Sequence, residues 1–247
     1  MRDDDTVHAK SAKFTTTRWT LVGHAQNPLS DQHVQAVSAL ASKYWKPVYY
    51  FIRAKGYPLQ RAEDLTQEFF LNFLERDWIR RADRTRGRFR TFLLAILVRF
   101  LCDQGPRRGS RQKRFEQAIV SVSSLLTDKD RKFEPAKGES PDDIFMQRWA
   151  AGLMEHVCAE VEQDFAAQGE AVRYQVFRDA CLAESERKLS QMALAKQYGL
   201  SRDQVRTALD QVREAFRRAF RNELRLDGCS KSEIEGELGD LMRLVEA

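Results

Sequence analysis

Polar and basic side chains recur at helical spacing near the C-terminal end of the chain, after Gly199. The residues expected on the outer face of this helix are Arg202, Arg206, Thr207, Asp210, Gln211, Arg213 and Arg217. The residues expected on its buried face are Val205, Leu209, Val212 and Phe216. The guanidinium fork of arginine matches both a phosphate group and the edge of guanine. The pattern therefore predicts a helix that can bind nucleic acid.

The residues before this helix predict a helix-turn-helix. A short helix is expected to end at Tyr198, and Gly199 suits the left-handed turn that follows. Ser201 can cap the next helix, and Gln204 stands three residues later, which is the spacing of a capping box. In a helix-turn-helix the second helix enters the major groove of DNA. The alternative is a helical hairpin whose charged face is only solvated.

A second basic segment lies between residues 80 and 114. It holds twelve Lys or Arg against two acidic residues, so its net charge is +10, whereas the whole chain carries +5. Cations of this kind can follow a nucleic-acid backbone, and interleaved aromatic rings can stack on bases. Phe89 and Phe100 are instead predicted to be core residues because they have helical spacing. Phosphate contact is expected of Arg86, Arg88, Arg90, Arg107, Arg108, Arg111, Lys113 and Arg114.

The remaining periodicity predicts an all-α protein of two small helical domains joined by a flexible linker. No stretch alternates as strands do. Composition divides the chain into an N-terminal extension (1–33), a first domain (34–115), a polar linker (116–140), a second domain (141–226) and an acidic extension (227–247).

The composition also argues against several classes of protein. The four cysteines and four histidines have no metal-site spacing, so no metal is expected. No nucleophile and base stand together, and no glycine-rich phosphate loop is present, so neither an enzyme nor a cofactor is expected. The polar N-terminus is unlike a signal peptide, and the longest apolar run, 92–98, is too short for a membrane span. These features predict a cytoplasmic protein without membrane insertion.

A basic aromatic domain followed by a linker and a helix-turn-helix resembles the extracytoplasmic-function class of RNA polymerase sigma factors. Four motifs carry the resemblance, at residues 61–70, 87–103, 199–213 and 16–22, and it extends over about residues 14 to 226. It implies that 34–115 is sigma domain 2 and that 141–226 is sigma domain 4. The partners that it implies are core RNA polymerase and promoter DNA, with an anti-sigma factor or another regulator in addition.

The resemblance also assigns roles to residues. Those implied to bind the polymerase clamp are Asp64, Leu65, Gln67, Glu68 and Phe69. Those implied for the −10 promoter element are Arg86, Arg88, Arg90, Phe92, Arg99, Arg107, Arg108 and Arg111, beside a loop (77–88) that would hold an unstacked base. Those implied for the −35 element are Arg202, Arg206, Thr207, Asp210, Gln211, Arg213 and Arg217.

The chain departs from the pattern of the class at several of these positions. Arg99 stands where Asn is frequent, Phe92 where Trp is frequent, and Ala208 where Arg is frequent. Asp210 and Gln211 replace neutral or basic residues. The preferred promoter sequence is therefore left open.

The C-terminal tail suggests regulation. Residues 226–247 hold six acidic residues against two basic ones, with an apolar stripe at helical spacing. One hypothesis is that the tail packs on a DNA-binding face and restrains it, and the alternative is that it only caps the second domain. Thr66 is a candidate phosphorylation site, since some members of the class are controlled in that way.

A different function would explain part of the pattern. A helix-turn-helix regulator that acts without core polymerase would bind a palindrome as a dimer. The acidic and apolar segment 62–70 favours the sigma factor instead.

Overall fold

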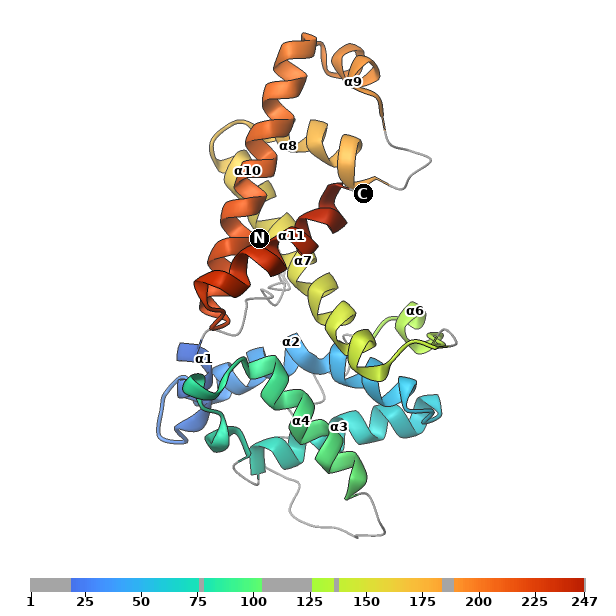
Figure 1. Cartoon of the computed structure of the whole chain (residues 1–247), viewed down its shortest axis with the longest axis vertical. Helices are drawn as coiled ribbons and strands as arrows, with labels where there is room; N and C mark the ends of the chain where they lie inside the picture. The colour runs from blue at the N-terminus through green and yellow to red at the C-terminus, as the bar shows by residue number, and fades with distance from the viewer. Residues whose placement is uncertain (1–18, 76–77, 104–125, 136–137, 184–188, 247) are drawn as a thin grey trace, which may run out of the picture.

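The structure is a computed structural model that describes residues 19–75, 78–103, 126–135, 138–183 and 189–246. Over these residues every regular element is helical, which confirms the all-α prediction (Figure 1). The first elements are α1 (Trp19–Gln26), α2 (His33–Ala54), α3 (Leu59–Glu75), η1 (Trp78–Arg81), η2 (Arg84–Arg86), α4 (Phe89–Cys102) and α6 (Asp128–Arg131). The others are α7 (Pro141–Ala167), α8 (Ala171–Phe177), the π-helical turn η3 (Arg178–Leu182), α9 (Gln191–Tyr198), α10 (Arg202–Leu226) and α11 (Lys231–Glu246).

Aromatic side chains pack α2, α3 and α4 together in the N-terminal half. Trp45 of α2 stacks on Phe70 of α3 with ring centroids 5.2 Å apart, and Phe69 meets Phe100 of α4 at 5.5 Å. Such ring pairs add about 0.5–1.5 kcal/mol beyond the area that they bury. Helix α1 joins this core through Val22, which is fully buried. Part of the predicted N-terminal extension is therefore core.

The described part of the predicted linker also packs on the N-terminal half. Helix α6 begins with a capping box between Thr127 and Asp130. Tyr50 of α2 donates a hydrogen bond to Asp130 (2.7 Å), and the Lys46 ammonium lies 3.1 Å from the same carboxylate. Although burial raises the pKa of Asp130, hydrogen bonds from Thr127 and Tyr50 lower it to about 2. This stretch docks because a buried carboxylate needs those donors.

Helix α7 begins at the predicted residue and serves both halves of the molecule. Ser140 caps it, Pro141 occupies its first position, and Asp142 and Asp143 face the positive end of the helix dipole. The buried residues of α7 are Ile144, Phe145, Trp149, Leu153, Val157, Val161 and Phe165. The first of these pack on α2, where Phe145 stacks 6.4 Å from Tyr44, and α7 also packs on α8 and α10.

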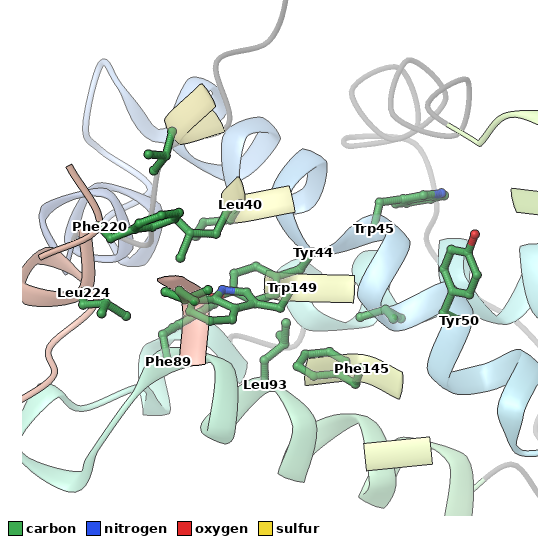
Figure 2. Close-up of a cluster of buried hydrophobic side chains, with 14 of the residues drawn as sticks. Leu40, Tyr44, Trp45, Tyr50, Phe89, Leu93, Phe145, Trp149, Phe220 and Leu224 are labelled. Carbon is green, nitrogen blue, oxygen red and sulfur yellow. The ribbon is translucent and has the colours of Figure 1, made fainter. Parts of the chain in front are cut away.

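The hydrophobic core runs without a break through both halves. Figure 2 shows Trp149 of α7 among Leu40 and Phe89 of the N-terminal half and Phe220 and Leu224 of α10. The predicted boundary at 140/141 is thus the start of a shared helix. Periodicity alone shows that α7 has an apolar stripe, but it does not show which helices cover the stripe.

The turn between α10 and α11 packs closely against Trp19 of α1. Gly228 has φ +91°, and a Cβ atom placed on it would lie 2.7 Å from Nε1 of Trp19. The Cys229 amide donates to the Leu224 carbonyl (3.1 Å), which closes the end of α10. None of the described helices has the length and apolar character that a membrane crossing needs.

The substitution Gly228→Ala tests this close fit. We expect it to lower the free energy of unfolding by about 2–4 kcal/mol, because it adds backbone strain to a steric clash. The matched control is Gly236→Ala within α11, where a Cβ meets no atom within 4 Å. This control should stabilise by about 0.5–1 kcal/mol. Urea denaturation of both variants measures the difference, and equal effects would contradict the packing.

Candidate nucleic-acid interface

The helix-turn-helix forms as the sequence predicts. Ser190 caps α9, and Gly199 ends it in the left-handed conformation (φ +65°, ψ +31°). Ser201 and Gln204 form both hydrogen bonds of a capping box at the start of α10. Val205, Leu209, Val212 and Phe216 are buried, as predicted. Local sequence thus determines how α10 is presented to solvent.

The exposed surface of the first turns of α10 is mixed in charge. We call it the α10 face, and its exposed members are Arg202, Asp203, Gln204, Arg206, Thr207 and Asp210. Arg206 lies 3.9 Å from Asp203 of the preceding turn, and such exposed pairs are worth little. The arginines of this face therefore stay available to an anion.

The other residues implied for the −35 element contact neighbouring side chains of the protein. Gln211 is exposed and accepts a hydrogen bond from Arg173 of α8 (2.6 Å). Arg213 is partly buried and lies 3.4 Å from Asp210, and Arg217 lies 3.6 Å from Glu214. Ala208 is only 2% exposed. Its departure from the class pattern therefore concerns the core of this structure and not its outer surface.

A second basic surface lies beside η1 and η2. This arginine groove is lined by Trp19, Gln26, Arg80, Arg81, Ala82, Asp83, Arg84 and Arg86. Gln26 of α1 holds its wall by donating to the carbonyls of Ile79 (3.0 Å) and Ala82 (2.8 Å). Asp83 caps η2 by accepting from the hydroxyl and the amide of Thr85, and these hydrogen bonds lower the pKa of Asp83. The groove brings four arginines and Trp19 of α1 together.

Sequence analysis named only one of the four groove arginines as a site residue. Arg86 is exposed on η2, whereas Arg80, Arg81 and Arg84 were included only in the net charge of the segment and in the loop 77–88 that was implied to hold an unstacked base. Trp19 comes from α1, about sixty residues earlier, and no spacing rule links the two segments. The density of arginine was the signal for the three missed cations, whereas the position of Trp19 required the fold.

Two of the residues implied for the −10 element are engaged within the chain. Arg88 binds Glu237 and Glu233 of α11, the latter at 2.7 Å. Arg90 is fully buried and forms ion pairs with Asp227 and Glu237. Its guanidinium carbon lies 4.0 Å from the centre of the Trp149 ring. In this structure Arg90 is therefore a core residue that cannot reach DNA, which corrects its assigned role.

The remaining residues of that set are scattered. Phe92 is half-buried and packs 6.1 Å from Phe89, whose own burial, like that of Phe100, agrees with prediction. Arg99 is exposed towards the other end of α4. Five predicted phosphate contacts lie outside the described residues, namely Arg107, Arg108, Arg111, Lys113 and Arg114. Those members of the set that the structure describes do not form one surface.

The predicted clamp-binding segment is α3. Asp64 is exposed, and Gln67 and Glu68 are partly exposed. Leu65 and Phe69 are fully buried in the core, so their side chains are not available to a partner. An amphipathic helix buries its apolar stripe in its own protein, which leaves the acidic edge of α3 for binding.

Thr66 is a poor candidate for phosphorylation in this structure. Its side chain is fully buried, and its hydroxyl donates to the Ala62 carbonyl one turn earlier (2.7 Å). A kinase would have to unfold α3 to reach it. In the folded protein Thr66 is therefore not accessible to phosphorylation.

A cluster of polar groups that sequence analysis missed joins α7 to α10. The ligand atoms of His156, Glu160 and Glu223 all lie within 4.8 Å of one another, and Glu223 is buried. His156 and Glu160 are four residues apart on α7, but Glu223 is far along the chain. We interpret the cluster as a polar contact between the two helices.

Lys43 lies beside the buried charges at the junction of the two halves. Burial lowers the pKa of its ammonium to about 7, although the charges of Asp227 and Glu223 oppose this shift. Burial also raises the pKa of Asp227, against the opposing charges of Lys43 and Arg90. The junction therefore holds groups that titrate outside their usual ranges.

No protein-family model, no curated protein and no solved structure matches this chain. What it binds is therefore inferred from its own surfaces and from the sequence motifs. The two surfaces rich in arginine are the α10 face and the arginine groove.

The lowered pKa of Lys43 predicts how the free energy of unfolding depends on pH. Between about pH 7 and 10.5 the unfolded chain binds a proton at Lys43 that the folded chain lacks, so this residue makes stability rise with pH. We expect Lys43→Met to remove that rise, as measured by urea denaturation at a series of pH values. Lys55→Met changes an exposed lysine and should follow the wild-type curve. A Lys43→Met curve parallel to wild type would contradict the lowered pKa.

Proposed function

We propose that this protein binds core RNA polymerase and directs it to promoter DNA, as a sigma factor of the extracytoplasmic-function class does. The observation that carries the proposal is the presence of two separate surfaces with exposed arginines, the α10 face of mixed charge and the basic arginine groove. Figure 1 has α9 and the start of α10 at one end of the molecule, and α1, which helps to line the arginine groove, in the opposite half. A factor that contacts two promoter elements needs two such surfaces.

The two surfaces suit different forms of DNA. The α10 face follows a helix-turn-helix, so it suits the major groove of a duplex, with Arg202 and Arg206 facing phosphates or guanine edges. The arginine groove is lined by four arginines and by Trp19, whose ring also packs edge-on against Phe89. Arginines beside an aromatic residue suit an unpaired strand. This division matches duplex binding at −35 and strand capture at −10.

The acidic edge of α3 supplies the proposed contact with polymerase. Asp64 is exposed there, with Gln67 and Glu68 beside it. A partner with a basic docking surface fits this edge. A regulator without core polymerase would not need it. The proposal places the protein in the cytoplasm with the polymerase and leaves room for an anti-sigma factor or another regulator.

Transcription in vitro tests the proposal directly. With purified core polymerase and a library of promoters, the full chain should produce transcripts from a subset of templates. Asp64→Lys should reduce polymerase binding by roughly tenfold by reversing a charge at the interface. Glu162→Lys, at an exposed position of α7, is the control. Sequence-specific duplex binding without any transcript would favour the polymerase-independent regulator.

Salt dependence tests the two DNA surfaces separately. Arg84→Ala with Arg86→Ala should lower the slope of log affinity against log salt by about 0.7 per lost phosphate contact on single strands. Arg202→Ala with Arg206→Ala should lower it by about 0.9 per contact on duplex. Fluorescence anisotropy gives both slopes. The control, Lys129→Ala with Lys132→Ala at exposed positions in and after α6, should leave both unchanged.

A further inference from the structure

We infer that α11 occupies the cation site at the start of α4 and keeps nucleic acid away from it until the helix is displaced. We call the set of Arg88, Glu233 and Glu237 the tail latch. The inference rests on the proposed function, because the excluded ligand is the strand that the arginine groove would bind. The acidic C-terminal extension is then the segment that occupies this cation site.

The contacts of the latch imitate those of a phosphate. One guanidinium nitrogen of Arg88 donates to Glu237, and another donates to Glu233 at 2.7 Å. Glu237 also accepts from Arg90, at 2.5 and 2.7 Å. The two glutamates are four residues apart on α11, so they share one face of the helix. Paired acceptors around a guanidinium group are the arrangement that a phosphate also provides.

The latch lies at the edge of the arginine groove. Arg88 is two residues beyond Arg86, which lines the groove. A strand that leaves the groove along this side would meet the carboxylates of Glu233 and Glu237 where it needs cations. Like charges in contact are repelled. The strand and α11 therefore compete for the same guanidinium group.

Burial separates a permanent anchor from a part that can open. The side chains of Arg90 and Asp227 are both 0% exposed, so their ion pair is shielded from solvent and salt. The side chains of Arg88 and Glu233 are 21% and 48% exposed, and partly exposed pairs are weaker and screened by salt. When α11 leaves Arg88, it must also break the Arg90–Glu237 pair and expose the apolar residues that it buries, while the turn at Asp227 stays attached to α4. The buried apolar residues of α11 are Ile234, Leu238, Leu241 and Met242.

Removing the latch charges tests the inference on the full chain. The variant Glu233→Gln with Glu237→Gln should bind a mixed-sequence single-stranded oligonucleotide about fivefold more tightly than wild type, because a larger fraction of molecules is open. Glu155→Gln with Glu162→Gln changes the net charge equally at exposed positions of α7 and should not reproduce the gain. Fluorescence anisotropy at one salt concentration compares the three proteins.

Cys229 is a native reporter of the position of α11. Its thiol is buried and lies 4.0 Å from a carboxylate oxygen of Glu237, and burial raises its pKa. Displacement of α11 should increase its alkylation by iodoacetamide, measured by peptide mass spectrometry against the exposed Cys102. The rate should rise in the double variant, and in wild type when the oligonucleotide is added.

The outcomes separate this inference from the proposed function. Equal oligonucleotide affinity of the double variant and wild type, or an unchanged rate of Cys229 alkylation, would overturn the latch even if the transcription assay succeeds. Tighter binding with faster alkylation supports the latch even if no transcript is obtained. In that case the polymerase-dependent part of the proposed function is the part that fails.

Discussion

The guanidinium group of Arg90 lies where α4, α7 and the end of α10 meet. It is fully buried, stacks over Trp149 and pairs with Asp227. A buried cation must keep its partners, since removal of one member of such a pair costs about 3–5 kcal/mol. The position of the α10–α11 turn on the N-terminal half therefore depends on this contact. The fit of Gly228 beneath Trp19 completes the same junction.

The junction also links charge to the arrangement of the helices. Lys43, Arg90 and Asp227 are buried close together. Burial lowers the pKa of Lys43 and raises that of Asp227, so it favours the neutral form of each. An apolar contact of the same size would hold the halves together without titrating. The lowered pKa of Lys43 instead predicts that stability depends on pH, and the partial exposure of the Arg88 pairs predicts that salt screens them.

Predictions about the surfaces succeeded where local sequence controls the geometry. The helix-turn-helix was predictable because Gly199 and the capping box at Ser201 act within a few residues of α10. The burial of Leu65, Thr66 and Arg90 was not predictable, because it depends on which distant helix covers each residue. Leu65 and Thr66 face the core from the middle of α3. A basic residue near the start of a helix looks the same in sequence whether solvent or a carboxylate lies beside it.

The amino-acid sequence alone was enough to predict a helical protein, the first residues of α4, α7 and α10, and the concentration of arginine between residues 80 and 114. These features follow from periodicity, capping and composition, which are local. Three contacts are evident only in the folded chain: α7 joins the two halves into one core, Trp19 lies beside the groove arginines, and the acidic tail reaches Arg88. Those contacts join residues far apart in the chain, and their energy depends on burial and on partners that no local pattern specifies.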